Sequence, residues 1–330
     1  MSDPIRHECG IAVVRLRKPL AYYHDKYGTA LHGFDKLYGL MSKQRNRGQD
    51  GFGIGCTKLN MPPGQPYMFR VRSTKSAEAI GEVFSDELKQ FNRIARRSNE
   101  GRKKMALRAA KEASATHGQE FVPELVKYQK FEDDPGAIKQ EFDLAGEIYL
   151  GHLRYGTSGN FGKGNLHPYL RRTNWATRSL MVMGNFNLTN TRELNEIMLK
   201  RGQHPVFGTD TQSVLEEIGF HLDEDHTDIY RTLRDEGVAS EDCVASISQQ
   251  LHVTEIIRRS AEHWDGGYTI AGTIGNGDAF VMRDPNGIRP CYYYMDEEII
   301  AFASERAALR TVFDLDEGKT CELQIGRAHV

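Results

Sequence analysis

The sequence predicts an α+β fold in which strands and helices mix without strict alternation. Two observations favour this class: helical patterns dominate the first half of the chain, and strand-like runs ending in turns become frequent in the second half. A doubly wound sheet needs strands and helices in regular alternation, and their order here does not provide it. The length of 330 residues allows one large domain or two ordinary ones.

Composition and charge exclude several classes of protein. Hydrophobic residues make up 39% and charged residues 27% of the chain, which argues against whole-chain disorder. The net charge of −2 argues against nucleic acid or an anionic membrane as the main partner. No apolar run approaches the roughly 18–20 residues of a membrane span, and the N-terminus lacks the features of a secretory signal. We therefore expect a cytoplasmic protein.

The cysteines indicate neither a disulfide framework nor a metal site. They are five in number, widely spaced and without a CxxC pair. One of them, Cys9, begins a short apolar segment, residues 9–14, which predicts a buried strand. A helix is expected over residues 30–43. The glycine-rich residues 45–54 then predict a tight loop that leads into a strand and forms a candidate site.

Residues 85–143 form a basic insert. Apolar positions recur at helical spacing over residues 85–118, which predicts one or two amphipathic surface helices. The basic residues of this stretch are Lys89, Arg93, Arg96, Arg97, Arg102, Lys103, Lys104, Arg108 and Lys111. They fit either a solvated helix face or a docking surface for a partner or a phosphorylated ligand. No metal site is predicted here or elsewhere in the chain.

The second half predicts short strands and helices in turn. Apolar, β-prone runs predict strands at residues 147–153, 179–183, 268–274, 279–283 and 292–294. Asn276-Gly277 predicts a hairpin turn, because both residues accept positive φ at low cost. Helices are expected at residues 192–201, 211–222 and 253–261.

The C-terminal residues 325–330 read IGRAHV, a translation of the start of a widely used sequencing adapter. We interpret them as an artefact of an interrupted gene fragment, with a genuine terminus as the alternative. Residues 316–324 are then the start of a truncated linker or C-terminal domain.

Five short segments carry the residues suited to chemistry. They are residues 7–11 (HECGI), 47–50 (RGQD), 151–157 (GHLRYGT), 184–190 (GNFNLTN) and 208–211 (GTDT). In this order and spacing they resemble the glutaminase domain of the class II glutamine amidotransferases, which are N-terminal-nucleophile hydrolases. Residues 283–290 (RDPNGIRP), followed by residues 303–305 (ASE), are similar to the amidophosphoribosyltransferase branch of that family. The resemblance covers nearly the whole chain apart from the basic insert.

The resemblance implies a four-layer αββα sandwich and a catalytic Cys9. A thiol with a pKa near 8.5 needs a base at neutral pH, and a free α-amine with a pKa of about 7.7–8.0 suits that task. An amide nitrogen does not. Residues 1–8 are therefore expected to be a propeptide, and residues 9–315 the amidotransferase domain; the uncleaved chain is expected to be inactive.

The same resemblance implies the residues that bind L-glutamine. Arg154 holds the α-carboxylate, Asp210 pairs with the α-ammonium group, and Asn185 donates to the oxyanion. Arg47, Gly48 and Thr157 complete the substrate site, Gly48 by allowing close backbone approach. Taken singly, Arg154 also fits a surface arginine that forms a salt bridge, and Asp210 fits a cap for a helix that begins at residue 211.

The residues beside Asn185 and Arg154 have their own expected roles. The family places glycine directly after the oxyanion asparagine, whereas this chain has Phe186. Because a Cβ resists positive φ, we expect the second oxyanion donor, the backbone N–H of Phe186, to be displaced. His152 is expected to point away from Arg154 and to be structural, like the four remaining cysteines.

The resemblance thus implies that the chain is the glutaminase half of an amidophosphoribosyltransferase, which supplies ammonia for phosphoribosylamine in purine synthesis. The phosphoribosyltransferase domain that accepts the ammonia is expected to be missing, and Mg²⁺ would belong only to that domain. No cofactor is expected in this chain, and the full-length protein is expected to be a homo-oligomer. Two alternatives stay open: an asparagine-synthetase-like glutaminase domain, since residues 287–290 and 292–294 also fit that group, and a regulatory module without catalysis.

Overall fold

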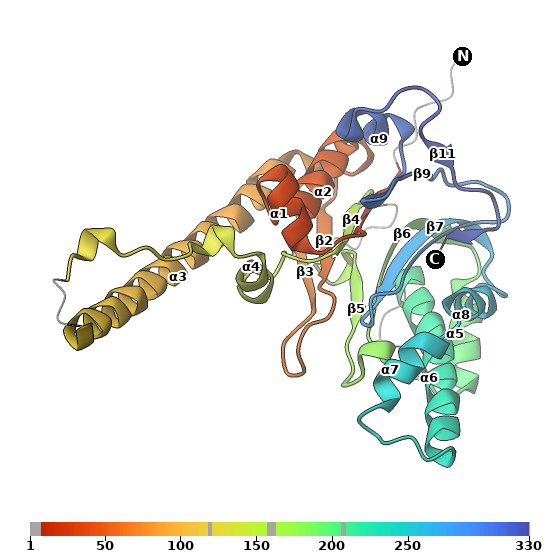
Figure 1. The fold of residues 1–330 in the computed structure, drawn as a ribbon. Helices are drawn as coiled ribbons and strands as arrows, with labels where there is room; N and C mark the ends of the chain where they lie inside the picture. The colour runs from red at the N-terminus through yellow and green to blue at the C-terminus, as the bar shows by residue number, and fades with distance from the viewer. Residues whose placement is uncertain (1–7, 118–120, 157–162, 206–208, 330) are drawn as a thin grey trace.

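Two antiparallel sheets form the centre of the protein (Figure 1). The structure is a computed structural model that describes residues 8–117, 121–156, 163–205 and 209–329. Every strand pairing among these residues is antiparallel. The predicted α+β class is therefore confirmed.

The larger sheet has β1 near its middle, and its strand order is β11-β9-β10-β1-β4-β2-β3. Val13 of β1 lies opposite Phe302 on one side and Leu150 on the other. The strands are β1 (Gly10–Leu16), β2 (Phe52–Thr57), β3 (Met68–Ser73), β4 (Ile148–Leu153), β9 (Tyr292–Met295), β10 (Ile299–Ala303) and β11 (Cys321–Glu322). The start of the chain is thus held between segments that are about 140 and 290 positions away in the sequence.

The smaller sheet has the strand order β12-β8-β7-β6-β5. Its strands are β5 (Tyr169–Arg171), β6 (Leu180–Leu188), β7 (Gly266–Ile274), β8 (Ala279–Arg283) and β12 (Ala328–His329). The pairing of β6 with β7 runs from Leu180 opposite Ile274 to Leu188 opposite Gly266. The predicted turn joins β7 to β8, where Gly277 has a φ of 107° and its N–H donates to Ile274 O.

A shared apolar core lies between the two sheets. Successive side chains of a strand point to opposite faces, so Ile11 and Val13 of β1 face the smaller sheet whereas Ala12 and Val14 face the helices. The smaller sheet contributes Met181, Met183, Ala271 and Val281 to this core.

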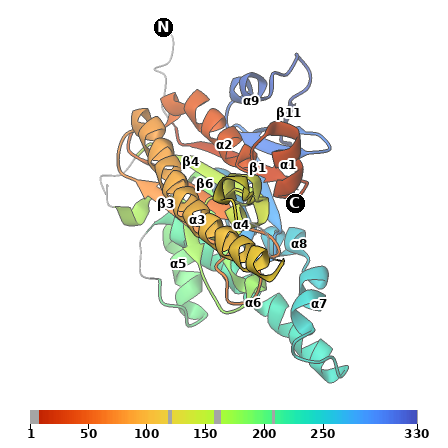
Figure 2. The same ribbon diagram turned by 60° about the vertical axis from the view of Figure 1, so that its left-hand side comes forward.

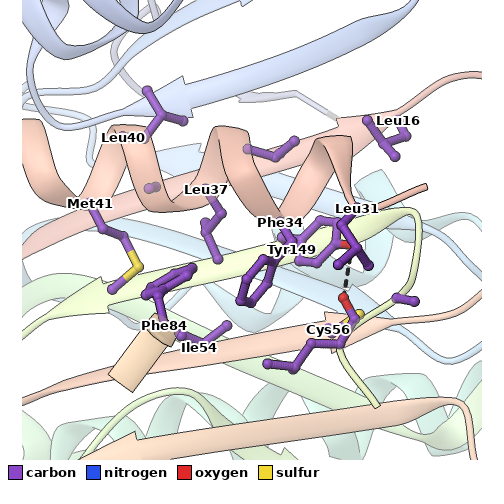
Figure 3. Close-up of a cluster of buried hydrophobic side chains, with 14 of the residues drawn as sticks. Leu16, Leu31, Phe34, Leu37, Leu40, Met41, Ile54, Cys56, Phe84 and Tyr149 are labelled. Carbon is purple, nitrogen blue, oxygen red and sulfur yellow. Dashed lines mark hydrogen bonds between the residues drawn. The ribbon is translucent and has the colours of Figure 1, made fainter. Parts of the chain in front are cut away.

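Three helices cover the outer face of the larger sheet: α1 (Leu20–Tyr27), α2 (His32–Lys43) and α9 (Arg306–Phe313). Figure 3 shows Phe34, Leu37 and Met41 of α2 packed over Tyr149 and Ile54 of the strands below. Each of these side chains is at most 1% exposed, and burial of one such side chain contributes about 1.5–3 kcal/mol. This apolar face fixes α2 on the sheet.

Four helices pack against the outer face of the smaller sheet: α5 (Thr191–Lys200), α6 (Asp210–Asp235), α7 (Cys243–Gln250) and α8 (Val253–Ser260). α6 begins after Thr209, whose side-chain oxygen accepts from the Gln212 N–H. It continues thirteen residues beyond the predicted end at residue 222, because His226 and Leu233 extend its buried face.

The basic insert forms one long helix, α3 (Ile80–His117), and a return segment that contains α4 (Pro135–Glu141). α3 begins five residues before the predicted start, because Ile80 and Phe84 are buried in the core. Its far end projects from the body in Figure 1, and in the turned view of Figure 2 the helix runs across the front of the molecule. Partway along α3, Arg102 contacts Asp134 of the return segment at 2.8 Å. Among the described residues, no helix combines the length and apolarity that a membrane span requires.

The segment beyond residue 315 adds an edge strand to each sheet. β11 pairs with β9 in the larger sheet, and β12 pairs with β8 in the smaller one. Between them Leu323 is buried, and its N–H donates to Cys291 O. The origin of residues 325–330 and the domain boundary at residue 315 stay predictions.

Candidate active site

Cys9 lies directly before β1, where the larger sheet begins, and is partly buried. Gly10 pairs with Leu153, the last residue of β4, so the chain that follows β4 passes beside Cys9. The backbone N–H of Tyr155 donates to Cys9 Sγ at 3.3 Å. Antiparallel pairing therefore joins the candidate nucleophile to a segment 146 positions away.

The environment of Cys9 favours the neutral thiol. Burial raises the pKa of the Cys9 thiol, whereas the Tyr155 N–H and the positive charges of Arg154 and Arg289 act in the opposite direction. The net pKa is raised, so a base is needed to form the thiolate at neutral pH.

Arg154 and Asp210 share a cavity of about 600 Å³ with Cys9. Arg154 follows β4, and its backbone is fixed by its N–H, which donates to Gly51 O at 2.8 Å. Asp210 is the first residue of α6, and burial raises the pKa of its carboxyl group. A guanidinium group and a carboxylate on one cavity match the two charges of an α-amino acid.

Asp210 also contacts the start of α6. Its Oδ1 accepts from the Thr211 N–H at 2.9 Å, while Thr209 is the capping residue. Asp210 therefore does contact the start of the helix, as the alternative role predicted, and it also lines the cavity.

Asn185 lies on β6 and is 2% exposed. Its Nδ2 donates to Glu8 Oε2 at 3.3 Å. The Glu8 carboxylate also accepts from Arg47 Nη2 at 3.1 Å and forms an ion pair with Arg289. The residue that precedes Cys9 thus occupies the amide that is predicted to hold the oxyanion.

Arg47 and Gly48 lie beside Cys9 and the end of β4. Arg47 Nε donates to Cys9 O at 3.3 Å. A Cβ at Gly48 would lie 2.6 Å from Leu153 Cβ and 2.8 Å from Arg154 N. Tight backbone packing against β4 therefore requires glycine at position 48, and its predicted role in substrate approach stays a prediction.

Phe186 does not adopt the positive φ that a glycine at this position would allow. It lies within β6 opposite Tyr268, in extended conformation. Outside the glycines, the positive φ values of the described residues belong to Asn60 and Asp314. Its role as an oxyanion donor stays a prediction. Thr157, the last predicted site residue, lies outside the described residues.

The expected orientation of His152 was wrong, whereas its structural role stays a prediction. His152 lines the same cavity as Arg154, because residues two apart on a strand lie on the same face. Among the remaining cysteines, Cys56, Cys243 and Cys291 are buried and Cys321 is exposed. Burial raises the pKa of the Cys291 thiol to about 12, which agrees with a structural role.

Arg289 is a residue beside Cys9 that the sequence motifs did not assign to the site. It ends a loop in which the Asp284 carboxylate accepts backbone N–H groups of Asn286, Ile288 and Arg289. This loop directs Arg289 toward Glu8 and Cys9. The motif at residues 283–290 was visible in the sequence, but its distance from Cys9 was not.

Two antiparallel sheets, with a cysteine at the head of a central strand and opposite charges on its cavity, are similar to the glutaminase domain of class II glutamine amidotransferases. No family model matches the chain. An amidophosphoribosyltransferase from Pasteurella multocida is 32% identical over 177 residues, which cover 51% of this chain and 30% of the relative. The enzyme of that name from Methanothermobacter thermautotrophicus is 24% identical over 192 residues, 57% of this chain and 35% of the relative. The matched part of the chain thus spans about a third of the length of these curated relatives.

Two solved structures are similar in fold. One is the glutamine phosphoribosylpyrophosphate amidotransferase from B. subtilis in complex with ADP and GMP, at 18% identity and a TM-score of 0.54. The other is an allosteric regulatory enzyme of purine biosynthesis, at 20% identity and a TM-score of 0.54. In both cases the match covers 97% of this chain and 46% of the other.

The predicted resemblance to the glutaminase domain of amidophosphoribosyltransferase is confirmed by these relatives. The asparagine-synthetase-like alternative is not favoured, since the matching curated relatives all carry the name amidophosphoribosyltransferase.

Proposed function

We propose that the chain is the glutaminase half of an amidophosphoribosyltransferase, which hydrolyses glutamine to glutamate and ammonia. One observation carries the proposal: Cys9, Arg154 and Asp210 come from three distant segments and line one cavity. The relatives' name supports glutamine as the substrate.

The fold supports the same class. Helices lie on the outer faces of two facing sheets, with a shared core between the sheets. We infer that this is the four-layer αββα sandwich of the N-terminal-nucleophile hydrolases.

The first step requires a free α-amine at Cys9. This amine takes the thiol proton, and the thiolate attacks the carboxamide carbon of glutamine. The C=O electron pair moves to the oxygen, where Asn185 Nδ2 donates a hydrogen bond. When the carbonyl re-forms, the C–N bond breaks, and the α-ammonium group returns its proton to the leaving ammonia. A γ-glutamyl thioester with Cys9 remains.

The second step consumes water. The α-amine takes a proton from water, hydroxide attacks the thioester carbon, and the C–S bond breaks to give glutamate and the Cys9 thiol. Arg154 and Asp210 hold the substrate's α-carboxylate and α-ammonium groups through both steps.

The leader keeps the chain inactive in this account. While residues 1–8 are attached, the Cys9 nitrogen is an amide and cannot act as the base. The contact of Asn185 with Glu8 adds a second obstacle, because the oxyanion donor is already occupied. We infer that removal of residues 1–8 as a propeptide activates the protein.

The ammonia acceptor would be a phosphoribosyltransferase part outside residues 9–315, and Mg²⁺ would serve only that part. A homo-oligomeric, cytoplasmic full-length enzyme follows from the same proposal. Within the chain described here, the proposal requires glutamine hydrolysis alone.

Glutamate release from glutamine tests this proposal, with the N-terminus read by intact mass in the same sample. We expect glutamate and ammonia in equal amounts from protein that begins at Cys9, and none from Cys9→Ala. Cys321→Ala is the matched control, because Cys321 is exposed and lies on β11. Mature protein that releases no glutamate would favour the regulatory module instead.

A further inference from the structure

Two buried histidines lie on the cavity and take no part in the proposed chemistry. His152 of β4 is 1% exposed, and His167, which precedes β5, is 8% exposed. Both line the cavity, and their ring centroids are 4.0 Å apart with an interplanar angle of 29°. They therefore form a stacked pair in its wall.

Both rings bind the same residue of β6, Gly184, which precedes Asn185. The Gly184 N–H donates to His167 Nδ1 at 3.1 Å. His152 Nε2 lies 3.0 Å from Gly184 O, the carbonyl of the peptide bond that leads into Asn185. His167 therefore binds the N–H of Gly184, and His152 binds its carbonyl oxygen.

These contacts fix the protonation of the rings. A carbonyl oxygen only accepts, so His152 donates from a protonated Nε2. His167 Nδ1 accepts, so its proton is on Nε2, which donates to Thr211 Oγ1 at 2.8 Å. Burial lowers the pKa of His152 to about 3 and holds the pKa of His167 well below its usual value, which keeps both rings neutral.

The network links the three segments that carry the predicted glutamine contacts. His152 is two residues before Arg154, Gly184 is next to Asn185, and Thr211 is next to Asp210. Arg154 follows β4, Asn185 belongs to β6, and Asp210 begins α6.

Phe186 completes the stack from the other side of Asn185. Its ring lies 5.7 Å from that of His167 at an angle of 29°. A Cβ at Gly184 would lie 2.5 Å from the Phe186 ring, so this ring fits because position 184 is glycine. The residues on both sides of Asn185 are thereby held by the histidine pair, Gly184 through its backbone hydrogen bonds and Phe186 through its stacking on His167.

We propose that His152 and His167 are positioning residues that hold Gly184 and so fix the Asn185 amide where the oxyanion forms. The inference rests on the proposed glutaminase function, which it deepens. The pair acts through hydrogen bonds to the backbone and does not touch the reacting atoms.

Two matched pairs of variants test the proposal in the full chain, with rates normalised to the fraction that begins at Cys9. His152→Gln keeps an N–H donor for Gly184 O, and His152→Leu removes it. Thr211→Ser keeps the acceptor for His167, and Thr211→Val removes it. We expect kcat for glutamine hydrolysis to fall at least tenfold in His152→Leu and Thr211→Val, with KM changed less than about threefold. His152→Gln and Thr211→Ser should stay within about threefold of the parent kcat.

A second readout does not depend on activity. In ¹⁵N NMR spectra, both rings should be neutral Nε2–H tautomers from pH 5 to 8, and the Asn185 side-chain amide should shift in Thr211→Val but not in Thr211→Ser. Rings that titrate near pH 6.5, an unmoved Asn185 amide, or equal losses in the conservative and apolar variants would overturn the proposal. A parent protein that shows the NMR signatures but releases no glutamate would contradict the proposed function and leave the histidine network standing.

Discussion

Replacement of Asn185 by aspartate tests the oxyanion contact. The side chain is 2% exposed and keeps its shape in Asn185→Asp, so no cavity forms. The change replaces the Nδ2 donor, now 3.3 Å from Glu8 Oε2, with an oxygen that cannot donate when ionised. Loss of one oxyanion donor costs about 2.7–4 kcal/mol of transition-state stabilisation, which corresponds to a kcat about 100–1,000-fold lower.

The assay is steady-state glutamate release, normalised by intact mass to the fraction of protein that begins at Cys9. KM for glutamine should change less than about threefold, because the donor acts on charge that develops in the transition state. Asn195→Asp is the control: Asn195 Oδ1 accepts from Ser213 in α6, and an aspartate keeps that contact. A kcat within about threefold of the parent in Asn185→Asp would refute the assignment.

Three further predictions concern Arg154, Gly48 and His152. Arg154→Lys loses the planar fork for the α-carboxylate, and we expect KM for glutamine to rise about 10–100-fold in initial-rate measurements, against an unchanged KM if the arginine is only structural. Gly48→Ala should lower the free energy of unfolding, measured in urea, by about 1–3 kcal/mol, because the added Cβ would lie 2.6 Å from Leu153 Cβ. Gly101→Ala is the control: position 101 on α3 faces open space, so this change should raise the free energy of unfolding by up to about 1 kcal/mol. Equal effects of the two changes would contradict the packing argument. The folded-state pKa of His152 is lowered to about 3, so the unfolded chain binds its proton first and stability is lost as pH falls below about 6.5. From pH 6.5 to pH 5 this single group should remove about 1.6 kcal/mol, a loss that urea titrations should show to be smaller in His152→Gln.

Local periodicity explains which elements could be predicted. The strands at residues 9–14, 147–153 and 279–283 correspond to β1, β4 and β8, because apolar residues with turns at their ends define them. The helix expected at residues 30–43 corresponds to α2 for the same reason. β10 and α9 were not predicted, since β10 is defined by its pairing with β1 across about 290 positions.

The candidate site was also predictable only in part. Motif spacing predicted Cys9, Arg154 and Asp210 as site residues, and the fold brings them to one cavity. It did not show that Arg289 meets Glu8, because that contact depends on how the loop after β8 packs against the start of β1. The error at His152 was one of geometry, since a strand places alternate residues on one face.

The most direct test of the account is whether the freed α-amine activates the Cys9 thiol. It uses protein samples in which an increasing fraction of the chains begins at Cys9. The account predicts that glutamate production rises in proportion to that fraction and extrapolates to zero for chains that retain Glu8. Undiminished glutamine turnover by a preparation in which every N-terminus still carries Glu8 would contradict it.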